Sequence, residues 1–391
     1  MKVVHAAKFY APYTGGMETI LADLCEGTAR DWDVDVVVAN DRAHTAHDER
    51  NGVGVTRVAA YGSAASVPLC PSLPSQLWAH AADCIVLHEP NPIAGTALWL
   101  RMPAPRFVIW HHSDLVRPWW APPTYGRVVQ RALYHRADCV IVSSPALAAD
   151  SPLVQCAQRV SVIPFGVDLA RYRRTDSAQV ARVERIRRQH TGGPLLLFVG
   201  RLVYYKGVHV LIEAASRWPG PVAVVGEGPL EPELRAAAAR RGLQDRIAFV
   251  GRVGDDELPA YYQACDALVL PSIARTEAFG VVQIEAMAAG RPVVSTNLPT
   301  GVPWVNRDGT SGLVVVAGDA DALGAALEQL GHDAALRGRL AEGARRRADV
   351  MFTRERMVQS FKSLIETVVR APARLADLPR PADVQRMDRA S

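Results

Sequence analysis

Short apolar runs alternate with longer amphipathic stretches along almost the whole chain. Runs rich in Val, Ile and Leu are typical of strands in a parallel sheet, because helices cover both faces of such a sheet. In the first half of the chain we expect strands at residues 3–5, 34–39, 84–88, 107–111, 139–143 and 160–163. In the second half we expect them at residues 195–199, 222–225, 247–250, 267–270, 292–295 and 312–316. The alternation predicts an α/β protein with two doubly wound domains.

Proline and glycine mark the place where the first series of strands ends. Pro164 and Gly166 follow the strand at 160–163, and the next stretch, 171–189, is charged and helical, so we expect the domain boundary there. The tail at 371–391 is rich in Pro, Arg and Asp and lacks apolar periodicity, which predicts disorder. Further helices are predicted at residues 230–241, 319–329 and 354–369.

Length and composition narrow the class of protein. A chain of 391 residues is too long for one typical core, and 49% apolar with 21% charged residues describes an ordinary globular protein without a membrane span. The N-terminal residues lack the apolar core of a secretory signal, and the six cysteines contain no CxxC pair, so we expect a soluble, cytoplasmic protein. A net charge of +4 suits phosphate-bearing ligands but is too small to indicate nucleic-acid binding.

The most informative segment of the chain contains two glutamates eight positions apart, Glu277 and Glu285. Helical spacing of apolar residues begins at Val281 and ends before the Gly-Arg-Pro sequence at 290–292, so Glu277 is expected before a helix and Glu285 inside it. A helix N-terminus offers unpaired N–H groups and a partial positive charge, which suit a phosphate, while the flanking acids suit sugar hydroxyls.

Other strand ends carry glycines or cations, and in open α/β sheets ligands bind at the carboxyl ends of the strands. Gly15 and Gly16 precede a helix after the first strand, and Gly226-Glu227 follows a strand of the second half. A tight turn explains such glycines equally well. Arg201 and Lys206 lie in one Gly-bounded loop, which predicts a diphosphate clamp, with solvated surface charges as the alternative.

These motifs, taken in order, resemble a known family. The segments GRLVYYKG, VVGEGP, EAFG with EAMA, and GRPVV, together with the early glycine pair, are similar to motifs of the family-4 retaining glycosyltransferases of the GT-B fold. The resemblance runs from residue 1 to about 350. It implies two Rossmann-like domains facing across a cleft, an acceptor-side domain at 1–166 and a nucleotide-sugar domain at 167–349, with a terminal helix at about 350–369 that returns to the first domain.

The resemblance also implies roles for individual residues. Arg201 and Lys206 would bind the donor diphosphate, Glu285 would hold the ribose hydroxyls, and Glu277 would bind the donor sugar with the backbone of Phe279 and Gly280. The catalytic residues implied are His112, Arg201, Lys206 and Glu277. The donor-binding residues implied are Gly15, Gly16, Gly200, Gly226, Glu227, Phe279, Gly280, Val281 and Glu285.

The catalytic histidine of the family falls after a strand of the first domain, where this chain reads WHHSD at 110–114. We assign the role to His112, because family members with a single histidine read WHSD; a structural, hydrogen-bonding histidine is the alternative, and His111 is interpreted as structural. Asp33-Val34-Asp35 resembles the metal-binding DxD of another glycosyltransferase fold, but it opens a buried strand. No metal is predicted.

The implied activity is metal-independent transfer of a hexose from a nucleotide diphosphate sugar to a hydroxyl, with retention of configuration and no bound cofactor. Segments 110–114 and 296–306 resemble mannosyltransferases of bacterial polysaccharide assembly. GDP-mannose is therefore the expected donor, with a UDP-hexose as the alternative, and the expected acceptor is a saccharide or lipid-linked saccharide. Two other classes stay open: a sugar phosphorylase with pyridoxal phosphate, and a non-catalytic nucleotide-sugar-binding protein.

Basic and aromatic residues form a margin between residues 117 and 136. Such a margin would favour peripheral contact with the inner face of an anionic membrane. A buried tryptophan pair beside a solvated helix face is the alternative. The residues concerned are Arg117, Pro118, Trp119, Trp120, Arg127, Arg131 and Arg136.

Overall fold

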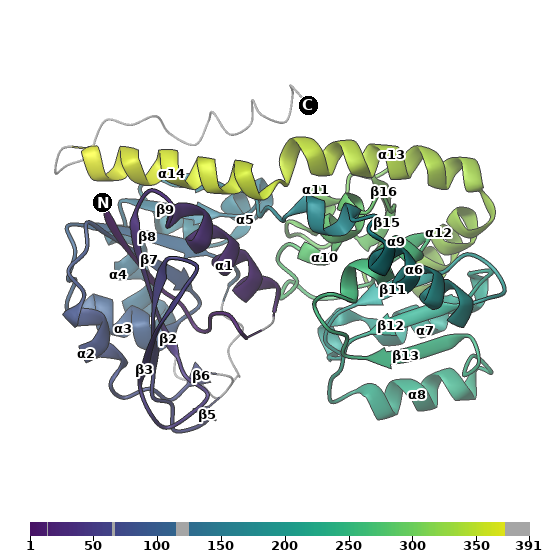
Figure 1. The fold of residues 1–391 in the computed structure, drawn as a ribbon, viewed down its shortest axis with the longest axis horizontal. Coiled ribbons are helices and arrows are strands. Elements are labelled where there is room, and N and C mark those ends of the chain that lie inside the picture. Colours follow the sequence, from purple (N-terminus) through teal and green to yellow (C-terminus); the bar gives the residue numbers. More distant parts are fainter. Residues whose placement is uncertain (14, 65–66, 115–124, 372–391) are drawn as a thin grey trace. The chain divides into compact units, whose positions relative to one another are not determined.

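The computed structural model describes residues 1–13, 15–64, 67–114 and 125–371. The chain divides into two compact units, one formed by Met1–Phe165 with the segment that begins at Arg354, and the other by Gly166–Thr353 (Figure 1). The second unit therefore ends at Thr353, a few residues later than the expected 349. In the described part of the chain, every helix is too short or too polar to cross a lipid bilayer.

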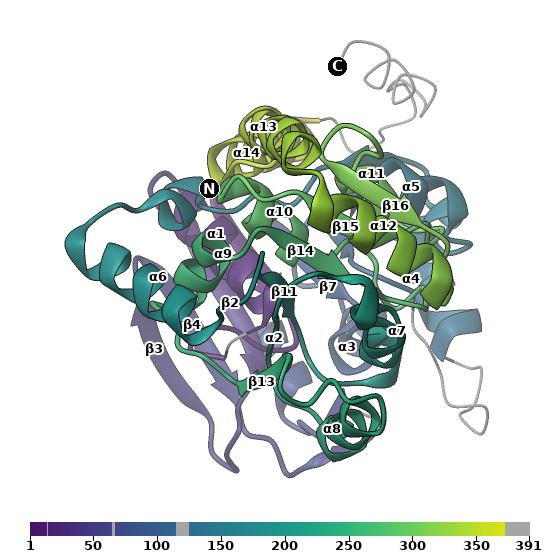
Figure 2. The same ribbon diagram turned by 90° about the vertical axis from the view of Figure 1, so that its right-hand side faces the viewer.

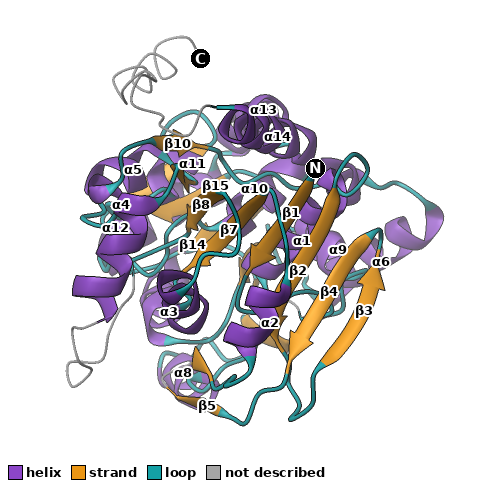
Figure 3. Ribbon diagram, turned by 90° about the vertical axis from the view of Figure 1, so that its left-hand side faces the viewer, coloured by secondary structure: helices purple, strands orange, loops and turns teal. Residues whose placement is uncertain are grey.

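The first unit is built on an eight-stranded sheet with the strand order β10-β9-β8-β7-β1-β2-β4-β3. Every neighbouring pair is parallel except β3 and β4, which pair antiparallel at the edge. Figure 3 shows β1, β2, β4 and β3 side by side. The strands are β1 (Lys2–Ala6), β2 (Asp33–Ala39), β3 (Ala46–Arg50), β4 (Val53–Val58), β7 (Cys84–Glu89), β8 (Arg106–His111), β9 (Cys139–Val142) and β10 (Val160–Val162).

Helices cover both faces of this sheet, because alternate residues of each strand point to opposite sides. Val4 and Ala6 of β1 join one apolar core, whereas Val36 and Val38 of β2 join a second core that includes Leu21 of α1. The helices of this unit are α1 (Gly16–Thr28), α2 (Leu73–Ala79), α3 (Pro92–Leu100), the π-helix η1 (Tyr125–Gln130), α4 (Arg131–Arg136), α5 (Pro145–Asp150), the 3-10 helix η2 (Val154–Cys156) and α14 (Arg354–Arg370).

The apolar pattern predicts six strands for this unit and misses two of the eight in the sheet. β3 is almost entirely polar and exposed, and it is an edge strand, so it carries no apolar signal. β4 is mostly buried, but Gly54, Thr56 and Arg57 interrupt its apolar sequence. A small antiparallel pair, β5 (Ser63–Ala64) and β6 (Val67–Pro68), is also missed because two-residue strands have no detectable period.

The second unit contains a six-stranded, fully parallel sheet with the order β13-β12-β11-β14-β15-β16 (Figure 2). All six strands lie where the apolar runs predict them. They are β11 (Leu196–Val199), β12 (Val222–Val225), β13 (Ile247–Gly251), β14 (Ala267–Leu270), β15 (Val293–Thr296) and β16 (Gly312–Val315).

Helices α7, α8 and α12 pack on one face of this sheet in a core that includes Phe198 and Trp218, and α10 contacts β14 and β15. The helices of the unit are η3 (Leu169–Arg173), α6 (Ser177–Gln189), η4 (Tyr204–Lys206), α7 (Val208–Ala214), η5 (Ala215–Arg217), α8 (Glu231–Arg240), α9 (Leu258–Ala264), α10 (Val281–Ala288), α11 (Val302–Val305), α12 (Ala320–His332) and α13 (Ala334–Met351). The predicted helix at 171–189 is two elements, because Asp176 caps α6 by accepting a hydrogen bond from Gln179 N at 3.1 Å.

The last helix, α14, belongs to the first unit and packs there through Phe361. This side chain is fully buried, and its ring centroid lies 5.6 Å from that of Trp110 and 6.3 Å from that of Trp32. Arg354 and Lys362 form ion pairs with Asp23 and Asp31 respectively. The aromatic contacts carry most of the stabilisation, because exposed ion pairs contribute little.

We expect Phe361→Ala to lower the free energy of unfolding of the first unit by about 3–5 kcal/mol, the usual cost of removing a buried aromatic side chain. Gln359→Ala, at an exposed position of the same helix, is the matched control and should change it by less than about 0.5 kcal/mol. Urea unfolding followed by tryptophan fluorescence measures both. Equal, small effects would show that α14 contributes no core packing.

Candidate active site

The two predicted cations of the second unit lie in the loop between β11 and α7. Gly207 ends η4 with a φ of 68°, a conformation that favours glycine. A Cβ atom at this position would lie 2.0 Å from the carbonyl oxygen of Pro271, and Ile273 N donates to Tyr205 O at 2.8 Å. The loop after β11 is therefore held directly against the loop after β14.

Lys206 forms an ion pair with Glu277, the first of the two spaced glutamates. The distance from Lys206 Nζ to Glu277 Oε2 is 2.5 Å, and the two side chains are only 12% and 9% exposed. Ser272 is fully buried and donates a hydrogen bond from Oγ to the same carboxylate oxygen at 3.0 Å. The structure brings together two predicted site residues, and it adds Ser272, which follows the predicted strand at 267–270 but belongs to none of the motifs.

Arg201 and Lys206 both contact Tyr205. Arg201 is exposed, and its Nη2 lies 3.5 Å from the Tyr205 hydroxyl; Lys206 Nζ lies 5.7 Å from the centroid of the Tyr205 ring. Gly200 opens this loop with a φ of 155°. Both predicted cations therefore lie around one aromatic ring at the carboxyl end of β11.

The glycine loop after β12 lies against the loop after β11. A Cβ atom on Gly226 would lie 2.0 Å from the carbonyl oxygen of Gly200, and Leu202 N donates to Glu227 O at 2.9 Å. The side chain of Glu227 is exposed, with Oε1 at 3.4 Å from Arg252 N. Close backbone packing explains the glycine at position 226 without a ligand, as the tight-turn alternative predicts. The exposed carboxylate of Glu227 lies at the same edge of the sheet as Arg201.

The helix between the two glutamates is α10, and its N-cap is Gly280 with a φ of 74°. A Cβ atom on Gly280 would lie 2.6 Å from a methyl group of Leu270, so both the conformation and the packing require glycine. Phe279 is buried, and its carbonyl accepts a hydrogen bond from Gln283 Nε2 at 2.9 Å. Val281 begins the helix, so Glu277 precedes the helix and Glu285 lies within it, as the sequence predicts.

Glu285 is held by two tyrosine hydroxyls. Tyr172 of η3 donates to Oε1 at 2.8 Å, and Tyr262 of α9 donates to Oε2 at 2.5 Å. Loss of solvation raises the pKa of Glu285, and the two tyrosine hydrogen bonds oppose this shift in part. Tyr172 and Tyr262 are distant in sequence and have no motif, so only the folded chain reveals them.

In the first unit, Gly15 and Gly16 stand at the start of α1. Gly15 is the N-cap with an extended backbone, and Gly16 is the first helical residue. A Cβ atom on Gly15 would lie 2.2 Å from Oε2 of Glu18. The predicted arrangement of a glycine pair before a helix is therefore present.

His112 directly follows β8, and its backbone N–H donates to Glu89 O at 3.0 Å. Its Nε2 lies 2.9 Å from Nδ1 of His88. His111 points to the other face of the sheet, where its Nδ1 lies 2.5 Å from the hydroxyl of Tyr134 and its side chain is 1% exposed. Burial lowers the pKa of His112 to about 3 and that of His111 to about 4, so both rings are neutral at physiological pH.

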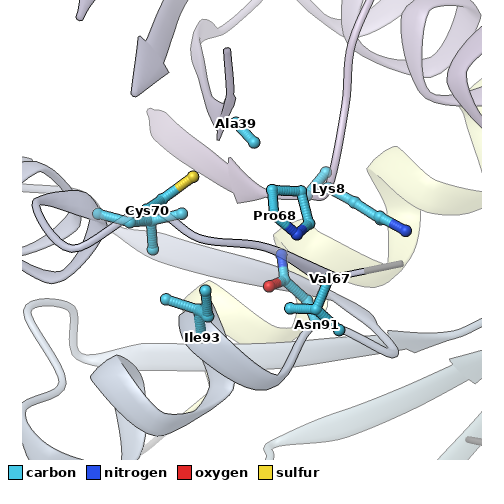
Figure 4. Close-up of a pocket in the computed structure, with 9 residues that line it drawn as sticks. Lys8, Ala39, Val67, Pro68, Cys70, Asn91 and Ile93 are labelled. Carbon is cyan, nitrogen blue, oxygen red and sulfur yellow. The ribbon is translucent and has the colours of Figure 1, made fainter. Parts of the chain in front are cut away.

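A pocket lies at the carboxyl ends of β1 and β2 in the first unit (Figure 4). Lys8, Pro68 and Ile93 line it, together with Asn91, the N-cap of α3. Asn91 is 7% exposed; its Oδ1 accepts from Ala94 N at 3.3 Å, whereas its buried Nδ2 has no hydrogen-bond partner among the described residues. The pocket wall is mainly apolar, and Asn91 carries a buried amide nitrogen without a partner among the described residues.

Asp33 and Asp35, the DxD-like pair, lie on β2, and both form ion pairs. Lys2 Nζ lies 3.4 Å from Asp33 and 2.9 Å from Asp35, and Asp35 also accepts from His80. Across the residues that the structure describes, no group of three or more His, Cys, Asp or Glu is arranged to hold a metal ion.

The predicted basic and aromatic margin falls largely outside the described residues. Arg117, Pro118, Trp119 and Trp120 lie within the undescribed segment 115–124, and the side chain of Arg127 is also undescribed. The tail predicted at 371–391 lies outside the described residues except for Ala371. Arg131 and Arg136 lie on α4, and both are exposed.

Comparison with known proteins identifies the family of the chain. The family model of glycosyl transferases group 1 matches residues 182–347, and that of the glycosyl transferase 4-like domain matches residues 15–166. The chain is 32% identical to the O-antigen chain mannosyltransferase C of Escherichia coli over 374 residues, which covers 94% of this chain and 99% of that protein. It is 33% identical to the D-rhamnosyltransferase WbpZ of Pseudomonas aeruginosa over 321 residues, covering 81% and 82% of the two chains.

Solved structures match the fold over the same extent. Sucrose-phosphate synthase from Thermosynechococcus elongatus gives a TM-score of 0.77 at 22% identity, covering 94% of this chain and 98% of that one. Anabaena HepE in complex with UDP-glucose gives 0.76 at 23% identity, covering 94% and 100%. The two doubly wound sheets thus have the GT-B fold. The chain belongs to the glycosyl transferases group 1, with a glycosyl transferase 4-like N-terminal domain.

The near-complete burial of the Lys206–Glu277 pair leads to a prediction about stability. We expect Lys206→Met to lower the free energy of unfolding of the second unit by about 3–5 kcal/mol, because it leaves a buried carboxylate without its countercharge. Lys206→Met combined with Glu277→Gln should recover a large part of this loss. Urea unfolding of the four proteins of the cycle gives the coupling energy, and simple additivity of the two single effects would contradict the pair.

The raised pKa of Glu285 leads to a prediction about pH. A carboxyl whose pKa is raised by folding adds stability below its ordinary pKa of 4.5, and this stability is lost as the pH rises through the folded pKa. The free energy of unfolding of the wild type minus that of Glu285→Gln should therefore fall as the pH rises from about 4 to about 7. Urea unfolding at a series of pH values measures this difference; a difference that grows with pH would mean that folding lowers the pKa of Glu285.

Proposed function

We propose that this glycosyltransferase moves mannose from GDP-mannose to a hydroxyl of a saccharide or lipid-linked saccharide, with retention of the anomeric configuration. The alternative donor is a UDP-hexose. The proposal assigns donor binding to the second unit, with Arg201, Lys206, Glu277 and Glu285, and it assigns His112 and the acceptor to the first unit.

The observation that carries this proposal is the buried ion pair between Lys206 and Glu277, next to the N-terminus of α10. A desolvated ammonium group and the unpaired N–H groups of a helix start are both suited to a diphosphate. Arg201 adds a second permanent positive charge in the same loop, and it is exposed to solvent and accessible to a ligand. Glu277 would then accept hydrogen bonds from hydroxyls of the donor sugar, while Lys206 contacts the phosphate.

Glu285 is suited to the ribose hydroxyls of the donor. Each of its carboxylate oxygens already accepts one tyrosine hydroxyl, and each retains a second lone pair for a further donor. The tyrosines fix the orientation of the carboxylate, so ribose binding requires little additional ordering.

The transfer needs one bond exchange at the anomeric carbon. The bond from this carbon to the phosphate oxygen breaks, a bond to the acceptor oxygen forms, and the acceptor proton passes to the departing phosphate on the same face. The positive charges of Arg201 and Lys206 would stabilise the nucleoside diphosphate as it leaves. This step requires no divalent metal and no cofactor, and we propose that the enzyme uses neither.

Two similarities support mannose. The relative from Escherichia coli is named a mannosyltransferase, and the one from Pseudomonas aeruginosa a D-rhamnosyltransferase. Segments 110–114 and 296–306 resemble mannosyltransferases of bacterial polysaccharide assembly. HepE, by contrast, is described in complex with UDP-glucose, and this supports the alternative donor.

For the acceptor, the proposal assigns binding to the first unit, the acceptor-side domain that the resemblance implies for residues 1–166. The exposed cations Arg131 and Arg136 of α4 favour peripheral contact with an anionic membrane surface, where lipid-linked saccharides would be presented.

Donor binding and turnover test the proposal together. GDP-mannose at about 100 times its Kd should stabilise the wild type by about 2.7 kcal/mol, measured as a rise in Tm, and UDP-glucose should do so only if the alternative holds. Arg201→Ala should lower kcat by roughly 10²–10³ with fold and Tm intact, and wild-type turnover should persist in EDTA.

Arg240→Ala is the matched control, because it removes one exposed arginine of the same unit on α8. Nucleoside diphosphate release with GDP-mannose and UDP-hexoses measures turnover for all variants. Equal turnover in Arg201→Ala and Arg240→Ala would contradict the clamp, and loss of turnover in EDTA with recovery on Mg²⁺ would contradict the metal-free step.

A further inference from the structure

Helix α10, which begins at the proposed donor site, starts without a cap. Its N-cap is Gly280, which has no side chain to accept a hydrogen bond, and the backbone N–H groups of Gly280, Val281 and Val282 have no acceptor among the described residues. Helix starts are usually closed by an N-cap side chain, or by a Glu or Gln at the third position that accepts from the N-cap N–H. Val281 and Val282 are partly exposed, so solvent reaches this first turn.

The third residue of α10 is Gln283, and its side chain points its N–H groups away from that role. The residue is completely buried, and Nε2 donates to Phe279 O at 2.9 Å and to Val302 O at 3.4 Å. Two carbonyl oxygens beside one end of the amide identify that end as the NH₂ group, because only N–H can donate to them. Oε1 is buried and has no partner among the described residues. The side chain therefore closes carbonyl groups and leaves the N–H groups of the helix start free.

The amide of Gln283 also occupies the space that a capping side chain would need. A Cβ atom on Gly280 would lie 2.8 Å from Gln283 Nε2, in addition to its close approach to Leu270. A Ser, Thr, Asn or Asp at position 280 would collide with this amide before its oxygen could reach an N–H group. Gly280 and Gln283 thus fit each other, and the open helix start is a consequence of their packing.

The other partner of Gln283 is α11, which lies in the segment 296–306 that the sequence analysis singles out. Three links join α11 to the residues just before α10. Gly301 N donates to Ala278 O at 2.8 Å, Gln283 bridges Phe279 O and Val302 O, and the ring centroids of Phe279 and Trp304 are 6.2 Å apart. The start of α10 is therefore held from behind by α11.

Helix α11 is only one turn long and is held in turn by Arg347 of α13. The guanidinium group donates from Nε to Val305 O at 2.9 Å and from Nη2 to Trp304 O at 2.5 Å. It also lies 5.6 Å from the ring centroids of both Trp304 and Phe352. A cation at the last carbonyls of a helix is favourable, and the stacked rings fix its place, so α11 is a firm support.

A neutral amide at position 283 has a chemical consequence. A glutamate there would accept from Gly280 N–H and would add a negative charge at the helix start. Both effects compete with an anionic ligand. Gln283 instead holds the first turn in place without charge, and it leaves the N–H groups and the partial positive charge of the helix to the ligand.

We propose that Gln283 is a positioning residue for the nucleotide sugar: it ties the start of α10 to α11 and keeps the N–H groups of Gly280, Val281 and Val282 free for the diphosphate. This inference rests on the proposed function, which places the diphosphate at this helix start. Gln283 does not touch the ligand. The segment 296–306 acquires a role as the support of the donor site.

Titration calorimetry with GDP tests the tie. Gln283→Met keeps the length of the side chain but removes both hydrogen bonds, so the Kd for GDP should rise roughly 10-fold. Gln283→Glu keeps the shape and adds an acid at the third helical position, so at pH 8 the Kd should rise roughly 10- to 100-fold. In turnover, the donor KM of Gln283→Met should rise by the same factor as its Kd, with kcat nearly unchanged. Wild-type Kd in either variant, or a lower kcat at unchanged donor KM, would overturn the proposal.

Leu327→Ala is the control for lost stability. It removes a completely buried side chain of α12 in the same unit, so it should lower Tm while the Kd for GDP stays at the wild-type value. An equal rise of Kd in Leu327→Ala and Gln283→Met would show that general destabilisation explains the effect, and the positioning role would be wrong.

Amide spectra of the wild type, labelled with ¹⁵N at Gly, Val and Gln, test the same contacts even if Gln283→Met does not fold. The side-chain N–H protons of Gln283 should exchange slowly with solvent, because they are buried and hydrogen-bonded. Saturating GDP should shift the backbone N–H signals of Gly280, Val281 and Val282. Fast exchange of the Gln283 amide, or unchanged signals from all three N–H groups, would overturn the proposal.

Failure of this proposal is distinguishable from failure of the proposed function. If the wild type binds UDP and not GDP, then the assignment of the base is wrong, and the same titrations with UDP test Gln283, since both ligands carry a diphosphate. If the wild type binds GDP and Arg201→Ala loses turnover while Gln283→Met binds GDP normally, then the donor site stands and Gln283 does not position it. If the wild type binds neither nucleotide, both proposals fall.

Discussion

Parallel strands of one sheet all end at the same edge, and this constraint determines where every candidate residue of the protein lies. In the second unit it gathers the loops after β11, β12 and β14, which are far apart in sequence but pack backbone to backbone at Gly200, Gly207 and Gly226. In the first unit it places His5, His88 and His112 in one row. Chemistry that depends on several loops is possible because the sheets are parallel.

Within the second unit, the Lys206–Glu277 ion pair is the central electrostatic feature. Two charges removed from water at a separation of 2.5 Å are costly to desolvate, and this cost is offset by their mutual attraction and by the hydrogen bond from Ser272. A ligand that offers a diphosphate to the lysine and hydroxyls to the glutamate provides partners for both members of the pair. In the proposed site, the ion pair would keep both side chains ordered before the donor binds.

The first unit uses neutral polar groups instead of charges. Its three histidines, His5, His88 and His112, are surrounded by Trp110, Phe165 and Phe361, and such an apolar environment favours uncharged imidazoles that hydrogen-bond to one another. α14 contributes Phe361 to this environment from the far end of the sequence. The second unit thus carries charge suited to an anionic donor, and the first carries neutral donors and acceptors suited to hydroxyls.

The sequence by itself determined the fold class, all six strands of the second sheet, and the placement of Glu277 before α10 and Glu285 within it, because apolar periodicity and Gly/Pro positions are local signals. It missed β3, whose polar residues carry no such signal, and it merged η3 with α6 across the Asp176 cap. Only the tertiary structure decided that Lys206 pairs with Glu277, that Tyr172 and Tyr262 hold Glu285, and that His5 and His88 join His112. Such contacts join residues that are distant along the chain, and they exist only once strand order and register bring those residues to the same edge and face of a sheet.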